Sequence, residues 1–97
     1  MKIQVIGFGK VGKSLIKLIE EKEETLELME IPIDVVSISD SKGTAIDRDG
    51  LELDEVVKQT KKGLCDMSEY VPNYSAIECV KNLQSDAVVE LTPSTAS

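Results

Sequence analysis

The sequence predicts an α/β fold in which helices flank a small parallel sheet. Three segments rich in β-branched residues, 2–6, 33–39 and 86–91, predict strands, and helical patterns separate them along the chain. Strands that alternate with helices in this way form parallel sheets with right-handed crossover connections. Three strands are few for such a sheet, and the 97-residue chain ends soon after the third. We therefore expect about the first half of a doubly wound domain, with residues 1–97 as one unit.

The first predicted helix begins at Lys10, directly after a glycine-rich turn, and extends to about Glu27, before Pro32. Its apolar residues recur at spacings of three, four and seven, which predicts one buried stripe. The stripe consists of Val11, Leu15, Leu18, Ile19 and Leu26. The second strand, residues 33–39, then leads into a polar stretch that predicts a loop as far as Gly50.

Two shorter helices are expected before the last strand. Leu51, Val56 and Val57 predict a helix that ends near Gly63, and residues 64–73 have no clear period and predict a loop. Ser75 and Glu78 have the spacing of a capping box, so a third helix should begin there and extend to about Gln84.

Composition excludes several classes of function. The net charge is −7, from 18 acidic and 11 basic residues, which disfavours nucleic acid as a partner because phosphate contacts need clustered cations. Histidine is absent, so His-ligated metal sites and His-based catalytic triads are excluded. Cys65 and Cys79 are read as buried thiols of a reducing cytosol. No segment has the length and apolarity of a membrane span, and we expect a soluble, cytoplasmic protein. Residues 47–50 lack the glycine and glutamate spacing of a calcium loop.

The strongest motif is the glycine pattern between the first strand and the first helix. Residues 7–12 read Gly-Phe-Gly-Lys-Val-Gly and fit G-x-G-x-x-G, in the strand–turn–helix context that gives this pattern meaning. In dinucleotide-binding folds Gly7 would form the tight turn, Gly9 would admit a diphosphate and Gly12 would let the helix pack closely. Lysines in the first helical turn and glutamates in the last oppose the helix dipole, so an anion at the amino end would be stabilising. This motif predicts a Rossmann-type fold.

Asp40 ends the second strand, where dinucleotide-binding folds carry an acidic residue that accepts hydrogen bonds from the adenosine ribose. The alternative is an aspartate that merely starts a turn. The carboxylate favours NAD, whereas Lys42 or Arg48 could hold the 2′-phosphate of NADP, so the cofactor is left as NAD or NADP. No pair of carboxylates has the spacing of a general acid and base, and no catalytic residue or metal ligand is assigned.

Together these segments resemble the amino-terminal NAD(P)-binding domain of homoserine dehydrogenase. The resemblance rests on residues 6–12, 39–43 and the Val-Val-Glu-Leu-Thr-Pro-Ser segment at 88–94, and residues 50–63 and 75–84 are similar to the helical insertion before that family's third strand. It implies that the diphosphate lies against Phe8, Gly9, Lys10 and Val11. It further implies that the adenosine ribose meets Asp40, Ser41 and Lys42, and that Leu91, Thr92 and Pro93 lie beside the cofactor.

The resemblance also implies an activity: interconversion of L-homoserine and L-aspartate 4-semialdehyde by hydride transfer, in threonine and methionine biosynthesis, by a homo-oligomeric enzyme. The family's catalytic lysine, substrate ligands and dimerising domain have no match here, so this chain alone is expected to be inactive. Two alternatives stay open, a stand-alone nucleotide-sensing Rossmann module without catalysis and the half-domain of another amino-acid dehydrogenase.

Overall fold

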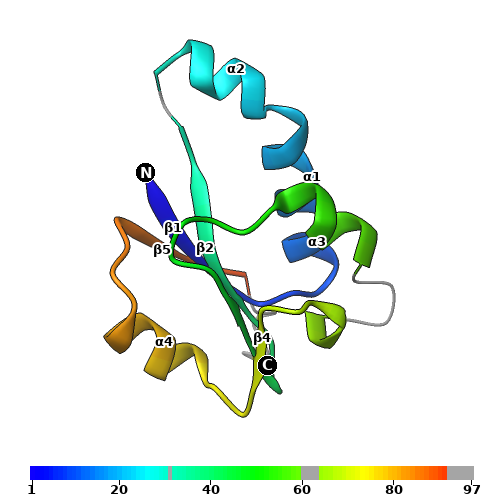
Figure 1. Ribbon diagram of the computed structural model, residues 1–97, viewed down its shortest axis with the longest axis vertical. Helices are drawn as coiled ribbons and strands as arrows, with labels where there is room; N and C mark the ends of the chain where they lie inside the picture. The colour runs from blue at the N-terminus through cyan, green and yellow to red at the C-terminus, as the bar shows by residue number, and fades with distance from the viewer. Residues whose placement is uncertain (31, 60–63, 92–97) are drawn as a thin grey trace, which may run out of the picture.

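The computed structural model describes residues 1–30, 32–59 and 64–91, which form one five-stranded sheet with helices on both sides (Figure 1). The strand order is β4-β3-β2-β1-β5. The strands are β1 (Lys2–Ile6), β2 (Asp34–Ser39), β3 (Gly43–Ile46), β4 (Tyr70–Pro72) and β5 (Ala87–Glu90). The helices are α1 (Lys10–Glu21), α2 (Glu23–Leu28), α3 (Leu53–Gln59) and α4 (Ala76–Asn82), with a single 3₁₀ turn, η1 (Leu64–Asp66).

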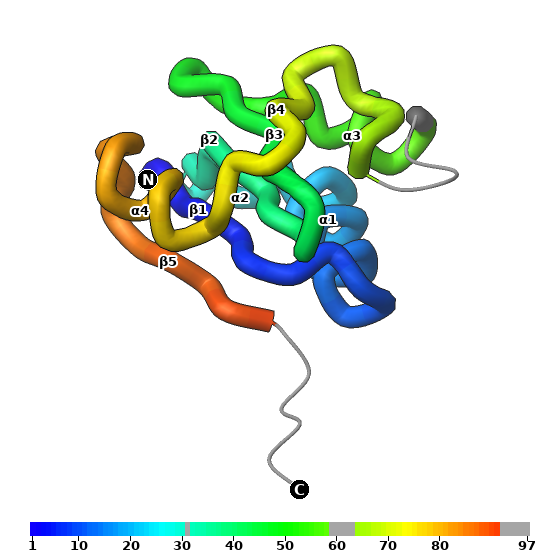
Figure 2. Tube along the Cα trace, turned by 90° about the horizontal axis from the view of Figure 1, so that it is seen from below, coloured from blue at the N-terminus to red at the C-terminus, as the bar shows by residue number. Residues whose placement is uncertain are grey.

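The centre of the sheet confirms the predicted Rossmann-type topology. β1 lies between β2 and β5 and is parallel to both. Ile6 pairs with Ser39 on one side and with Glu90 on the other, so the three carboxyl ends meet at one edge. Helices α1 and α3 cover one side of the sheet and α4 lies on the other (Figures 1 and 2). The connection from β1 to β2 thus runs over one face of the sheet, and the helix that precedes β5 lies on the other. This reversal beside β1 creates the switch point where ligands bind in such folds.

Two segments expected to be loops are strands, and the sheet is therefore mixed rather than parallel. β3 runs antiparallel to β2, and β4 runs antiparallel to β3. Both are too short to show a period. β4 contains Pro72, which is tolerated because β4 lies at the edge of the sheet. Buried hydroxyls reinforce the pairing: Ser39 and Thr44 share a hydrogen bond of 2.9 Å.

The helix predicted from Lys10 to Glu27 is broken at Lys22 into α1 and α2. The Lys22 amide donates to the carbonyls of both Leu18 (3.0 Å) and Ile19 (3.2 Å), which tightens the last turn of α1. No residue of α2 is buried, so packing does not keep it in line with α1. Such breaks depend on tertiary contacts and have no signal in the apolar spacing.

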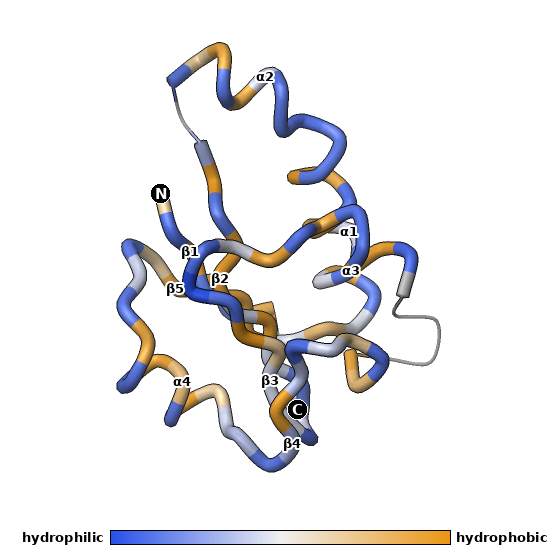
Figure 3. Tube along the Cα trace, in the orientation of Figure 1, coloured by the Kyte–Doolittle hydropathy of each residue, from blue (hydrophilic) through white to orange (hydrophobic). Residues whose placement is uncertain are grey.

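The buried face of α1 is rotated from the predicted stripe. Gly12, Ile16 and Ile19 are buried, whereas Val11 is 63% exposed and Leu18 is 51% exposed. The close contact of Gly12 with the glycine turn fixes which face points inward. The inward face packs in the main core against apolar residues of the central strands, which are the orange stretches of β1 and β2 in Figure 3, and against α3. These core residues are Ile3, Val5, Val35, Ile38, Leu53 and Val56.

The remaining elements follow the sequence more closely. The Ser75 hydroxyl accepts a hydrogen bond from the Glu78 amide at 3.1 Å, which confirms the cap of α4. Cys79 of α4 is buried against Val36 and Leu83, but Cys65 is exposed, because Leu64 and Met67 fill the core at that turn. The predicted helix end at Gly63 lies outside the described residues. Within the part of the chain that the structure describes, no helix is long and apolar enough to cross a membrane.

Candidate functional site

The glycine turn joins the carboxyl end of β1 to the amino end of α1. Gly7 has a φ of +104°, a conformation that side chains disfavour, and its amide donates to the Ser39 carbonyl at 2.8 Å. Gly9 is the N-cap of α1, and its carbonyl accepts the first helical hydrogen bond, from the Lys13 amide, at 2.9 Å. The turn is thereby tied to β2 as well as to β1.

Gly12 lies behind the turn and makes close packing possible. A Cβ at this position would lie 2.4 Å from the Gly7 carbonyl oxygen, so any side chain would push α1 away from the turn. Gly9 has the opposite surroundings, because a Cβ there would have no atom within 4 Å. The open space beside Gly9 is where an anion can approach backbone amides at the positive end of α1.

The first turn of α1 carries positive charge and no acidic residue. Lys10 is exposed, and the Lys13 ammonium lies 5.5 Å from the centre of the Phe8 ring, within cation–π distance. Gly9, the N-cap residue, has no side chain, so no side-chain hydrogen bond caps the helix. The amino end of α1 is therefore suited to a diphosphate in geometry and in charge.

Asp40 directly follows β2 and forms a tight turn with the residues after it. Its Oδ1 accepts hydrogen bonds from the amides of Lys42 and Gly43, both at 2.8 Å, and from the Tyr70 hydroxyl at 3.0 Å. Burial and this bond to Asp40 raise the pKa of Tyr70 to about 12. Ser41 and Lys42 are exposed at the tip of the turn.

The glycine turn and the Asp40 turn line one cavity of about 370 Å³, formed by residues 6–9 and 39–41. The structure thus brings Gly7, Phe8 and Gly9 together with Asp40 and Ser41. Lys42 lines a neighbouring cavity of about 390 Å³, with residues 73–77 on its far side. Leu91 follows β5 at the same edge and donates its amide to the Ile6 carbonyl at 2.7 Å.

The other candidates divide into three groups. Gly12 is buried behind the turn and Val11 is exposed on α1, so neither lines the cavity. Thr92 and Pro93 lie outside the described residues. Arg48 follows the carboxyl end of β3, which runs antiparallel to β2, so it lies toward the opposite edge of the sheet from Asp40. Lys42 is therefore the cation next to Asp40.

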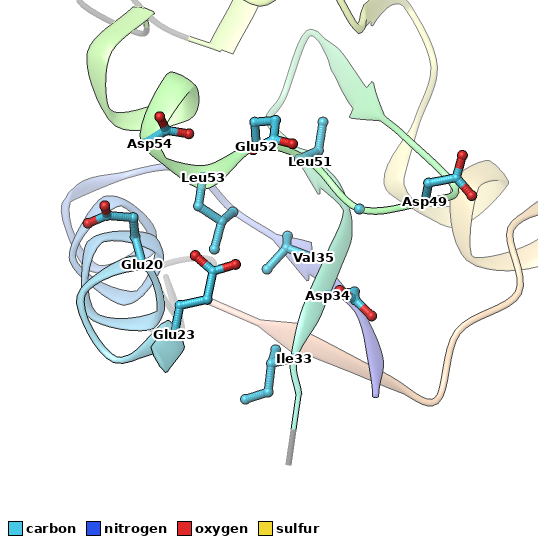
Figure 4. A pocket seen from close by; sticks show the side chains of 11 residues that line it. Glu20, Glu23, Ile33, Asp34, Val35, Asp49, Leu51, Glu52, Leu53 and Asp54 are labelled. Carbon is cyan, nitrogen blue, oxygen red and sulfur yellow. The ribbon is translucent and has the colours of Figure 1, made fainter. Parts of the chain in front are cut away.

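A larger cavity, of about 430 Å³, lies at the amino end of β2 and is strongly acidic (Figure 4). Partial desolvation at the cavity wall and the neighbouring carboxylates, Glu27 first among them, raise the pKa of Glu23, although its side chain is exposed. A negatively charged diphosphate does not fit such surroundings. The described residues contain no group of three or more side chains arranged to hold a metal ion. The carboxylates that line this cavity come from α1, α2, β2, the loop between β3 and α3, and α3: Glu20, Glu23, Asp34, Asp49, Glu52 and Asp54.

Sequence reasoning missed Tyr70, which contacts Asp40 from a strand 30 residues away. The turn itself had a signal, since aspartate at the first position and glycine at the fourth are typical of turns held by the aspartate side chain. The tyrosine had none, because β4 was not expected.

A glycine turn, a helix that begins behind it and an acidic strand end define a dinucleotide-binding fold of the dehydrogenase type. The family model for Glutamate/Leucine/Phenylalanine/Valine dehydrogenase matches residues 1–94, and the chain belongs to this family.

The similar proteins are homoserine dehydrogenases. That of Methanocaldococcus jannaschii is 36% identical over 96 residues, which cover 97% of this chain and 29% of the relative. That of Pyrococcus horikoshii is 34% identical over 94 residues, 95% of this chain and 28% of the relative. A hyperthermophilic archaeal homoserine dehydrogenase solved in complex with NADPH is 29% identical, with a TM-score of 0.74 over 94% of this chain and 28% of that chain. The chain spans less than a third of the length of these relatives, and its predicted resemblance to their NAD(P)-binding region is confirmed.

Proposed function

We propose that residues 1–97 are the amino-terminal part of the NAD(P)-binding domain of a homoserine dehydrogenase. The observation that carries this proposal is the cavity at the carboxyl edge of the sheet, where the open backbone of Gly9 and the carboxylate of Asp40 face the same space. The relative solved with NADPH supports the choice of cofactor class. NAD and NADP both fit the charges at the site, since Asp40 and Lys42 are neighbours.

In this proposal the backbone of the glycine turn holds the diphosphate, with Phe8 and Gly9 in the cavity and Lys10 and Val11 beside it in the first turn of α1. Asp40, Ser41 and Lys42 meet the adenosine ribose, and Leu91, Thr92 and Pro93 lie beside the rest of the cofactor. The bound nicotinamide supplies the hydride acceptor or donor. The described residues bind and orient this group, and we assign none of them a catalytic role.

The proposal for the whole protein is interconversion of L-homoserine and L-aspartate 4-semialdehyde, as part of threonine and methionine biosynthesis in the cytoplasm. We propose a homo-oligomer that has neither nucleic acid nor membrane as a partner. The alternative of a stand-alone nucleotide sensor is less favoured, because such modules are expected to lack the segment that here forms β3 and α3. Another amino-acid dehydrogenase is less favoured because the curated relatives are homoserine dehydrogenases.

Calorimetric titration of the 97-residue chain with NAD⁺ and NADP⁺ tests cofactor binding. We expect saturable binding of at least one of them, and a loss of NAD⁺ affinity of roughly tenfold in Asp40→Ala, the effect of removing one hydrogen bond to a charged group. Asp47→Ala is the matched control, because Asp47 also holds a turn, through the Asp49 amide at 2.9 Å, but lies toward the other edge of the sheet. Equal NAD⁺ affinity in Asp40→Ala and the parent would remove Asp40 from the site.

A second measurement concerns the reaction. The chain mixed with homoserine and NADP⁺ should give no increase in absorbance of the reduced cofactor, because no catalytic group is assigned among its residues. Turnover above background would show that the chain does contain catalytic residues.

A further inference from the structure

The two carboxylate oxygens of Asp40 have different surroundings. Oδ1 accepts three hydrogen bonds, from the amides of Lys42 and Gly43 and from the Tyr70 hydroxyl. A carboxylate oxygen has about two lone-pair sites, so three donors saturate it. Oδ2 has no hydrogen-bond partner among the described residues, and Asp40 lines the cavity beside the glycine turn. The orientation of the carboxylate is therefore set by contacts to Oδ1 alone.

Two of these contacts are local and the third comes from a distant segment. The amides of Lys42 and Gly43 belong to the turn that Asp40 starts, an arrangement common in turns. The Tyr70 hydroxyl reaches Asp40 from β4, which is held in place because Gly43, Thr44 and Ala45 of β3 pair with it. Tyr70 also packs against the main core. A rigid sheet element thus supplies the donor that the turn alone cannot provide.

Tyr70 is suited to this task over a wide pH range. Burial and the bond to Asp40 raise its pKa to about 12, so the hydroxyl stays protonated and remains a donor at neutral pH. An aspartate held only by two backbone amides can still rotate about its side-chain torsions. The third donor removes that freedom before any ligand arrives.

We propose that Tyr70 is a positioning residue for cofactor recognition: it holds Oδ1 of Asp40 so that Oδ2 is presented to a ribose hydroxyl of the bound dinucleotide. This inference rests on the proposed cofactor-binding function. Tyr70 acts through Asp40 and contacts no cofactor itself. Because a fixed carboxylate cannot turn away from a 2′-phosphate, Tyr70 also increases discrimination between NAD⁺ and NADP⁺.

Tyr70→Phe removes one oxygen and keeps the ring that packs in the core. We expect the Kd for NAD⁺ to rise roughly fivefold, as for loss of one hydrogen bond. The Kd for NADP⁺ should change less, because the freed carboxylate can move away from the 2′-phosphate, so the ratio of the two constants shifts toward NADP⁺. Tyr74→Phe is the matched control. Among the described residues the Tyr74 hydroxyl is bonded only to the Asn82 side chain, from which it accepts at 3.2 Å, so its loss should leave both constants unchanged.

Asp40→Asn gives an independent result. The amide oxygen can still accept at the Oδ1 position, so the unfolding temperature should stay near that of the parent, whereas NAD⁺ affinity should fall because Oδ2 is replaced by a donor. An unchanged ratio of NADP⁺ to NAD⁺ affinity in Tyr70→Phe, or NAD⁺ binding by Asp40→Asn equal to the parent, would overturn the inference while leaving the proposed function intact. Absence of binding of either cofactor by the parent would instead overturn the proposed function.

Discussion

Replacing Gly12 with alanine tests whether the glycine turn and α1 must meet without a side chain between them. The new Cβ would lie 2.4 Å from the Gly7 carbonyl oxygen and 3.2 Å from its carbon, whereas ordinary contact begins at 3.4 Å. The turn cannot easily retreat, because the Gly7 amide is bonded to the Ser39 carbonyl at 2.8 Å. The substitution must therefore separate the turn from α1 by about 1 Å, the distance that restores an ordinary contact.

Two opposing terms set the size of the effect. Overpacking a well-packed core costs about 1–3 kcal/mol, and a backbone neighbour held on both sides favours the upper end. Alanine is a better helix former than glycine by about 1 kcal/mol. The net loss of unfolding free energy is about 2 kcal/mol, which for a domain of this size corresponds to a fall in Tm of about 8–16 °C.

Thermal unfolding followed by circular dichroism measures this loss, and Gly9→Ala is the control. Its Cβ would have no atom within 4 Å, so its stability should stay within about 1 kcal/mol of the parent, the size of an N-cap change. The same Cβ would stand where a diphosphate approaches, so Gly9→Ala should lose NAD(P) affinity instead. A Gly12→Ala protein as stable as the parent would refute the steric reasoning, and a Gly9→Ala protein with undiminished affinity would refute the assignment of the anion site.

Three further predictions concern charge. Glu23→Gln should stabilise the fold at pH 7 by about 0.2–0.5 kcal/mol for each like-charge pair relieved. Because the pKa of Glu23 is raised from 4.5, its protonated form is favoured by folding, so this gain should vanish below pH 4.5 in denaturant titrations. Tyr74→Phe leaves Tyr70 as the sole tyrosine, so phenolate absorbance should show it titrating near pH 12 in the folded protein and near pH 10 in the unfolded one. The free energy of unfolding should therefore fall as the pH rises from 10 to 12. Lys42→Ala should weaken NADP⁺ binding roughly fivefold and NAD⁺ binding less, whereas the control Arg48→Ala should change neither affinity. Equal losses of affinity for both cofactors in Lys42→Ala would count against Lys42 as the 2′-phosphate ligand.

The sequence was sufficient to predict the parts of the fold in which apolar residues recur regularly over many positions. The strands β1, β2 and β5 and the start of α1 could be predicted because buried parallel strands and an amphipathic helix each leave a pattern over many residues. β3 and β4 could not, because backbone pairing and the hydroxyls of Ser39 and Thr44 hold them rather than an apolar run. The break at Lys22 and the exposed Val11 depend on which neighbours each face meets.

The candidate site divides in the same way. Gly7, Gly9 and Asp40 could be predicted because the turn and the strand end fix their places relative to the sheet. The Tyr70 contact to Asp40 could not, since it joins residues 30 positions apart through a strand without a sequence signal. Turns and strand ends can be predicted from adjacent residues, whereas the contacts that fix a side chain within a site depend on residues brought together by the tertiary structure.

The separation of charge along β2 explains how a chain with a net charge of −7 can present an anion site. The acidic cavity begins at Asp34 and the candidate site at Asp40, at opposite ends of a six-residue strand. A rise of about 3.3 Å per residue places the two ends roughly 17 Å apart. The Debye length is about 10 Å at 0.1 M ionic strength, so carboxylates at that distance are largely screened from a ligand at the glycine turn. The free amides of α1 and the first-turn residues Lys10 and Lys13 lie at the same edge of the sheet as the candidate site, although neither lysine lines its cavity. At physiological ionic strength these nearby positive groups outweigh the net charge.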